Sequence, residues 1–235
     1  HYKADEVRVL APIPVPVRDI ICVGKNYAEH AKEVQRSSFN TLQGKQAVPT
    51  KPIIFNKATT SVIGPNDKIE TKNDETKTTD YEGELGVIIG KRAKSISKAN
   101  AFDIIFGYTI INDVTARELQ NNHKQWFIGK SPDTYCPMGP AVITKDEINN
   151  IDEVKLQTFV NEEERQVGIV KDMVFTIPVL IETLTKSMTL VEGDIIATGT
   201  PAGVGIGFDP PKFLKPGDKV KVSIEPIGTL ENEVI

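Results

Sequence analysis

Tyr81-Glu82-Gly83-Glu84-Leu85-Gly86-Val87-Ile88-Ile89 is the strongest strand signal in this chain. Its apolar residues alternate and predict one buried face. Because successive side chains of a strand point to opposite faces, Glu82 and Glu84 share a face. Taken alone, two glutamates on one face are better explained as ordinary solvated surface. Here an apolar run follows them directly, and a strand that enters a core is an unusual place for exposed charge.

A third carboxylate, Asp113, ends the apolar run of residues 106–112. One interpretation makes it the N-cap of a helix predicted over residues 114–121. The other interpretation brings it beside Glu82 and Glu84. Three carboxylates without a histidine would form an all-oxygen site of the kind that suits Mg²⁺ or Mn²⁺. Zinc prefers nitrogen and sulfur ligands, and the sequence offers no suitable spacing of these.

His30 and Glu33 lie three residues apart in a segment that we expect to be helical, so their side chains share a face. A carboxylate beside an imidazole orients it and raises its basicity, which suits it to remove a proton from water. The alternative is an exposed histidine that pairs weakly with a neighbouring acid, and for an isolated pair that alternative is preferable.

The rest of the chain predicts short strands and a few helices. We expect strands at residues 19–24, 52–56, 104–112, 140–144, 154–161, 166–169, 195–198, 220–224 and 231–235, and helices at 27–34, 95–101, 114–121 and 177–185. Residues 35–50 are polar and show little periodicity, and such a long loop in a compact domain is often functional. We therefore predict one α+β, mainly β domain over residues 1–235.

Composition excludes several classes of protein. The 235 residues are 39% hydrophobic, which is enough for a core without disulfides or structural metal. A formal net charge of −4 and the absence of a basic stripe argue against a nucleic-acid partner. Two cysteines do not form a disulfide framework, and no apolar run is long enough to span a membrane. We expect a cytoplasmic protein with no membrane association.

Five motifs, in this order along the chain, resemble the fumarylacetoacetate hydrolase superfamily. They are Gly-Lys-Asn-Tyr-Ala-Glu-His at 24–30, Tyr-Glu-Gly-Glu-Leu at 81–85, Asn-Asp-Val-Thr-Ala-Arg at 112–117, Gly-Lys-Ser-Pro-Asp-Thr at 129–134 and Thr-Gly-Thr-Pro-Ala-Gly-Val-Gly at 198–205. The resemblance runs from about Val9 to the C-terminus. It implies a mixed β-sandwich or β-roll like the C-terminal domain of that family, and it implies a homodimer.

The resemblance also implies roles for individual residues. It makes Glu82, Glu84 and Asp113 the ligands of Mg²⁺ or Mn²⁺. It makes His30 and Glu33 a water-activating pair on a lid continued by residues 35–50, and it assigns substrate or enolate contacts to Arg117, Gln120, Lys130 and Thr200. Without it, Arg117 and Gln120 would be surface residues of one helix, Lys130 an ordinary loop lysine, and Thr200 part of a turn.

One departure from the family pattern narrows the match. Longer hydrolases of the superfamily carry a further aspartate ligand before the histidine segment, where this chain has the apolar residues Ile20-Ile21-Cys22-Val23. The match is therefore to a shorter, three-carboxylate branch. Bacterial relatives often have a small N-terminal domain before the catalytic one, and we expect that this chain either lacks such a domain or has lost it.

These observations predict a metal-dependent enzyme that acts on a small 2-oxo acid through an enolate. Because His30 and Glu33 suit water activation, hydrolysis of a C–C bond in a 1,3-dicarbonyl acid is placed slightly ahead. The alternatives are a decarboxylase, tautomerase or isomerase of a 2-oxo dicarboxylic acid, which shares the same enolate. A more remote alternative is a small-molecule-binding module that has kept the fold without activity.

Overall fold

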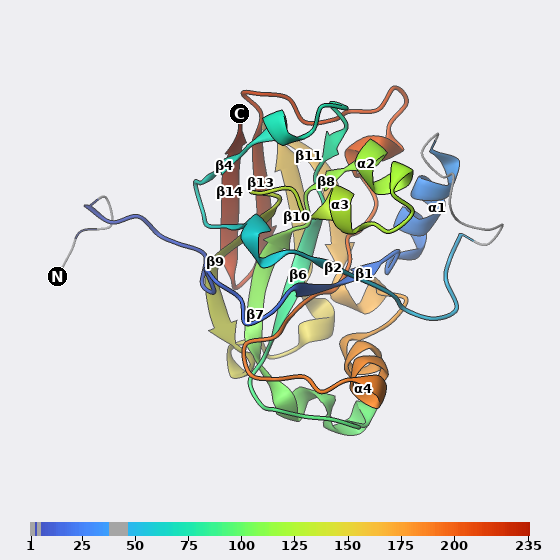
Figure 1. The fold of residues 1–235 in the computed structure, drawn as a ribbon. Coiled ribbons are helices and arrows are strands. Elements are labelled where there is room, and N and C mark those ends of the chain that lie inside the picture. Colours follow the sequence, from blue (N-terminus) through green and yellow to red (C-terminus); the bar gives the residue numbers. More distant parts are fainter. Residues whose placement is uncertain (1–2, 4–5, 38–46) are drawn as a thin grey trace.

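The computed structural model describes residues 3, 6–37 and 47–235, and two β-sheets dominate it (Figure 1). The larger sheet contains, in spatial order, β2 (Ile53–Lys57), β1 (Ile20–Gly24), β12 (Ile195–Ala197), β6 (Gly83–Ile89), β7 (Ile105–Asn112), β9 (Cys136–Thr144) and β3 (Val62–Ile63). The smaller sheet contains β11 (Glu163–Ile169), β10 (Lys155–Val160), β13 (Lys219–Ile224), β14 (Gly228–Val234) and β4 (Lys68–Ile69). A separate antiparallel pair joins β5 (Thr79–Asp80) to β8 (Thr115–Ala116).

The two sheets pack against each other through apolar side chains. Leu85 and Val87 of β6 share one buried cluster with Leu156 of β10 and Val222 of β13. Burial of each such side chain contributes about 1.5–3 kcal/mol. The sheets approach each other closely at the start of β6, where a Cβ on Gly83 would lie 2.2 Å from Thr158 Oγ1. The predicted buried face of residues 81–89 is therefore the face that joins the sheets.

The described residues also form four α-helices, namely α1 (Ala28–Arg36), α2 (Arg117–Asn122), α3 (Phe127–Lys130) and α4 (Ile177–Ser187). Figure 1 shows α1, α2 and α3 gathered at one side of the sheets, with α4 at the lower end of the molecule. The prediction of a mainly β, α+β domain with few short helices is confirmed. Within the described ranges, no helix has both the length and the apolarity that a membrane crossing requires.

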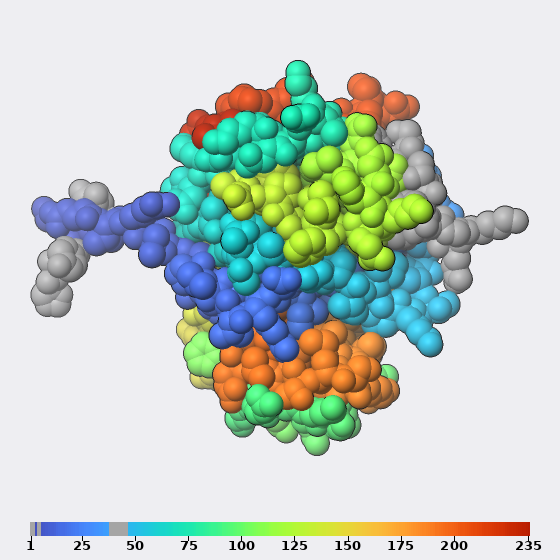
Figure 2. All heavy atoms as spheres, viewed as in Figure 1, coloured from blue at the N-terminus to red at the C-terminus, as the bar shows by residue number. Residues whose placement is uncertain are grey.

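The segment before β1 crosses one face of the molecule, and Figure 2 shows it in dark blue above the orange region that contains α4. Its backbone packs closely at Gly64, where a Cβ would lie 2.5 Å from the nitrogen of Ala11. Ala11 is buried there in a second apolar cluster with Ile20 and Met138. This cluster covers the face of the larger sheet that lies away from the smaller sheet.

Three local predictions were wrong. The helix expected over residues 114–121 begins only at Arg117, because residues 115–116 pair with β5 as a short strand, and Asp113 caps no helix. The helix expected at 95–101 is a 3₁₀ helix at Lys98–Ile104. Lys130 was expected in a loop but is the last residue of α3. Of the predicted lid continuation at 35–50, residues 38–46 lie outside the described part of the chain.

Candidate active site

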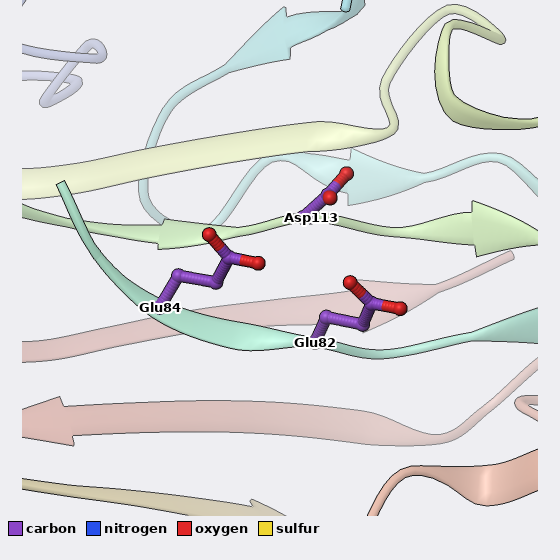
Figure 3. Close-up of side chains that lie close together, drawn as sticks. All are labelled: Glu82, Glu84 and Asp113. Carbon is purple, nitrogen blue, oxygen red and sulfur yellow. The ribbon is translucent and has the colours of Figure 1, made fainter. Parts of the chain in front are cut away.

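Three carboxylates meet where two antiparallel strands bring their ends together (Figure 3). Gly83 of β6 pairs with Asn112 of β7, so the next pair in the same register is Glu82 with Asp113. The backbone confirms this step, since the Asp113 N–H donates to the Glu82 carbonyl at 2.8 Å. Glu82, Glu84 and Asp113 are all buried, and each offers an oxygen within 4.8 Å of the others. The strand alternation predicted for the two glutamates and the register of β7 together produce the cluster.

Two buried lysines neutralise part of this charge. Lys130 at the end of α3 donates from Nζ to Glu82 Oε2 at 2.8 Å and to Asp113 Oδ2 at 2.7 Å. Lys57 at the end of β2 lies 2.7 Å from Asp113 Oδ1, and it also donates to the carbonyl groups of Val114 and Lys130. Asp113 is thus paired on both oxygens, whereas the Lys130 ammonium group bridges two of the three carboxylates.

Glu84 differs from the other two carboxylates. It accepts a hydrogen bond from the Gly199 N–H at 2.8 Å, because β12 continues antiparallel to β6 and places Gly199 opposite it. It forms no ion pair with any side chain in the described ranges. Burial, followed by the neighbouring charges of Asp113 and Glu82, raises the pKa of Glu84 well above its usual value.

The pKa of Glu82 is shifted in the opposite direction. Burial disfavours its charged form, but the charges of Lys130, Arg117 and His30 outweigh burial and hold the pKa of Glu82 below its usual range. One site therefore contains a carboxylate that is ion-paired with two cations, Lys130 and Arg117, and another that has no ion pair among the described residues. Such opposed shifts at adjacent buried groups are typical of functional sites.

A hard divalent cation fits this donor set. Ion pairs add Lys57, Arg117, Lys130 and Asp80 to the three carboxylates, and this buried set carries one net negative charge when all its members are ionised. Carboxylate oxygens suit Mg²⁺ and Mn²⁺. Sulfur does not compete, because burial raises the pKa of Cys136 to about 12 and that of Cys22 well above its usual value, and both remain thiols.

The predicted histidine–carboxylate pair is present on α1. His30 Nδ1 lies 3.3 Å from Glu33 Oε2, and the His30 side chain is 6% exposed. Glu33 also accepts from the Gly203 N–H at 3.0 Å. The carbonyl of Gly203 accepts from the Tyr81 hydroxyl at 2.8 Å, and Tyr81 directly precedes Glu82, so the pair lies near the segment that carries the cluster. The alternative of an exposed, weakly paired histidine does not describe it.

The residues expected to contact substrate have different surroundings. Arg117 is buried, and its guanidinium bridges Glu82 and Asp80 at 2.6 and 2.9 Å. Thr200 is buried and donates to the Gly83 carbonyl at 2.9 Å while accepting from Gln166 at 2.7 Å. Gln120 is half-buried on α2, where its backbone packs against Gly129 of α3. All three lie in or next to the elements that carry the cluster, and their contact with substrate stays a prediction.

Three residues of the site were missed in the sequence. Lys57 comes directly after the strand expected at residues 52–56, and a lysine at the end of an apolar strand was a usable signal. Asp80 precedes the two glutamates by a few residues and accepts from the N–H groups of Gly205 and Ile206. Gln166 holds the start of β6 by accepting from the Gly83 N–H at 3.0 Å. The last two act through backbone contacts that no sequence spacing reveals.

Comparison with known protein families shows where this arrangement of residues occurs. A family model described as fumarylacetoacetate (FAA) hydrolase C-terminal matches residues 19–235. The chain belongs to this family. The resemblance inferred from the five motifs is confirmed, and the chain is an enzyme of the fumarylacetoacetate hydrolase family, whose members bind divalent metal.

Relatives within the family have several activities in their names. The chain is 53% identical over 234 residues to oxaloacetate tautomerase YisK of Bacillus subtilis (strain 168), a match that covers 99% of this chain and 75% of the relative. A solved fumarylacetoacetate hydrolase from Exiguobacterium antarcticum is 47% identical with a TM-score of 0.86, covering 99% of this chain and 79% of that one. A 2-hydroxyhepta-2,4-diene-1,7-dioate isomerase from Mycobacterium marinum is 37% identical with a TM-score of 0.81, covering 100% and 80%. These structures confirm the expected fold.

Proposed function

We propose that this chain is a metal-dependent tautomerase of a small 2-oxo dicarboxylic acid of the oxaloacetate type. The enzyme would move a proton between the carbon next to the keto group and the keto oxygen. The name of the Bacillus subtilis relative supports this activity, and the isomerase among the structural relatives supports proton transfer more generally. Hydrolysis, which the sequence placed first, becomes the second candidate.

One observation carries the proposal, namely the position of the Lys130 ammonium group between Glu82 and Asp113. Burial disfavours its charge, but Asp113 and Glu82 outweigh burial and raise the pKa of Lys130. A lysine held in its charged form inside a cluster of metal-binding type can donate a hydrogen bond to developing negative charge on an enolate oxygen. Such an arrangement serves any reaction that passes through an enolate.

The residues of the chain divide the work of a tautomerase. Glu82, Glu84 and Asp113 would hold the metal, which when bound supplies a Lewis acid for the keto and carboxylate oxygens of the substrate. His30, oriented by Glu33, would take the proton as the C–H bond breaks. Lys130 would give a proton to the enolate oxygen as the O–H bond forms. The return of a proton from His30 to Lys130 through solvent restores both residues.

The test is the exchange of the oxaloacetate C3 protons in D₂O, monitored by proton NMR. It compares enzyme loaded with Mg²⁺, free of Mn²⁺, with an EDTA-treated sample. We expect exchange above the rate of a metal-only blank, and its loss after EDTA. His30→Asn should lower the exchange rate about 10²–10⁴-fold, the usual contribution of a positioned base. His123→Asn is the matched control, since His123 is exposed beyond the end of α2.

Parallel substrates separate the alternatives. Release of CO₂ from oxaloacetate faster than C3 exchange would favour a decarboxylase. Metal-dependent cleavage of acetylpyruvate without exchange of oxaloacetate would restore hydrolysis to first place. The absence of metal-dependent turnover of any 2-oxo acid would leave a binding module as the better description.

A further inference from the structure

The glycine-rich segment 203–207 presents three backbone N–H groups to two carboxylates from different elements. The Gly203 N–H donates to Glu33 Oε1 at 3.0 Å and Oε2 at 3.2 Å. Two residues later, Gly205 donates to Asp80 Oδ1 at 2.6 Å, and Ile206 donates to Asp80 Oδ2 at 3.0 Å. The N–H groups of one short segment therefore bind both Glu33, the partner of His30 on α1, and Asp80, the buried residue that ends β5.

Glycine is needed at these positions because the carboxylates come too close for a side chain. A Cβ on Gly207 would lie 1.9 Å from Glu33 Oε1, and a Cβ on Gly205 would lie 2.6 Å from Asp80 Oδ1. Gly203 also has a φ of +104°, which other residues rarely adopt. The spacing of the three glycines matches neither a dinucleotide fingerprint nor a regular strand. The close approach of the two carboxylates to this backbone explains it.

The side chain of Arg117 connects Asp80, which is bound by this segment, to the cluster of Glu82, Glu84 and Asp113. Arg117 donates from Nε to Asp80 Oδ2 at 2.9 Å, and its Nη1 lies 2.6 Å from Glu82 Oε1. Asp80 is fully buried and Arg117 is 4% exposed, so neither can turn to solvent. The segment, Asp80, Arg117 and Glu82 thus form a continuous series of charge-assisted hydrogen bonds.

We infer that Asp80 is a positioning residue for the metal ligand Glu82, acting through Arg117 and held in place by the N–H groups of Gly205 and Ile206. Asp80 shares the positive charge of Arg117, and this leaves Glu82 with negative charge to offer a cation. The hydrogen bond that Asp80 accepts from the Arg117 guanidinium also fixes the orientation of the Glu82 carboxylate. The inference rests on the metal site of the proposed function, and it gives Arg117 a role other than substrate contact.

The test measures Mn²⁺ affinity by electron paramagnetic resonance titration of EDTA-treated, dialysed protein, which needs no turnover. Asp80→Asn keeps the shape of the side chain, and we expect it to weaken Mn²⁺ binding about 10–100-fold, the usual effect of removing a partner of a metal ligand. Asp194→Asn is the matched control, because Asp194 is also buried and pairs with an arginine, Arg18, at the far end of β12. It should change the affinity less than twofold.

A second variant separates positioning from a simple change in net charge. Arg117→Lys keeps the positive charge but removes the planar guanidinium that reaches both carboxylates. We expect a loss of Mn²⁺ affinity of about tenfold or more in this variant too. Circular dichroism of each variant shows whether it is folded, and the lysine variant also serves if Asp80→Asn does not fold.

Two results would overturn the inference. One is a folded Asp80→Asn protein that binds Mn²⁺ within twofold of the wild type. The other is an unchanged affinity in Arg117→Lys, which would mean that only net charge matters. If the wild-type chain itself binds no Mn²⁺, the metal site of the proposed function is contradicted. That result differs from one in which the wild type binds Mn²⁺ and the variants bind it equally well, which contradicts only the role of Asp80.

Discussion

Glu84→Gln should stabilise the metal-free protein and abolish its response to metal. Glu84 is buried, with an exposed fraction of 1%, and it has two acidic neighbours and no cation of its own among the described residues. Glutamine keeps the shape of the side chain and can still accept the hydrogen bond from Gly199. The substitution therefore removes buried negative charge and keeps an acceptor for the buried Gly199 N–H group.

The size of the effect follows from the geometry. Two unit charges 4.8 Å apart, the limiting distance within the cluster, repel by about 3.5 kcal/mol at an effective dielectric constant of about 20. Attraction to Lys130 and the Gly199 hydrogen bond offset part of this. We expect a gain of about 2 kcal/mol in the free energy of unfolding, or about 4–8 °C in Tm for a chain of this size.

The gain should depend on pH. In the unfolded chain Glu84 has a pKa near 4.5, and in the folded chain its pKa is raised. Between these two values the folded protein holds a proton that the unfolded chain has lost, so wild-type stability falls as pH rises through this window. The stability advantage of Glu84→Gln should thus be absent below about pH 4.5 and grow towards neutral and higher pH.

Calorimetric unfolding of both proteins, in EDTA and in MnCl₂, measures these differences. At a free Mn²⁺ concentration of about 100 Kd the wild type should gain about 2.7 kcal/mol, and the variant almost nothing. A Glu84→Gln protein that is less stable than the wild type in EDTA would refute the reasoning about uncompensated charge. A variant that gains as much from Mn²⁺ as the wild type would remove Glu84 from the ligand set.

Three further substitutions test neighbouring parts of the site. Glu82→Gln should destabilise the metal-free protein by about 3–5 kcal/mol in urea unfolding, because it leaves the buried Lys130 charge short of a partner. Glu33→Gln should lower kcat for C3 exchange more than it raises KM, because it weakens the orientation of His30 without touching a metal ligand. Gly207→Ala should lower the same kcat about tenfold or more, since the new Cβ would displace the Glu33 carboxylate, while Mn²⁺ affinity stays within twofold.

Each of these has an outcome that contradicts it. A Glu82→Gln protein as stable as the wild type in EDTA would mean that the ion pair with Lys130 contributes nothing. Equal changes of kcat and Mn²⁺ affinity in the Glu33 or Gly207 variants would mean that the α1 pair and the metal site are not separate functions.

The sequence predicted the local part of the site well. Alternation along residues 81–89 placed Glu82 and Glu84 on one face, and helical spacing placed His30 beside Glu33. Both predictions depend only on the repeat of a single element. Five strands of the larger sheet were also expected close to where they occur, because each is an apolar run ended by glycine, proline or a polar residue. The two-residue strand β3 was not expected, and β9 begins at Cys136, before the predicted strand at 140–144.

Contacts between elements could not be predicted in the same way. Asp113 had two equally good interpretations from sequence, and only the register of β7 against β6 chose between them. Lys57 reaches the cluster because β2 lies at the edge of the larger sheet next to β1, and no local pattern fixes that order. The hydrogen bonds of Asp80 to Gly205 and Ile206 join residues more than a hundred positions apart.

The most direct test of the account is a crystal of this protein soaked in MnCl₂, with diffraction recorded for the anomalous signal of manganese. The account predicts one strong peak per chain, bonded to one oxygen each of Glu82, Glu84 and Asp113. A peak elsewhere, or no peak at a Mn²⁺ concentration that saturates other proteins of the family, would contradict it.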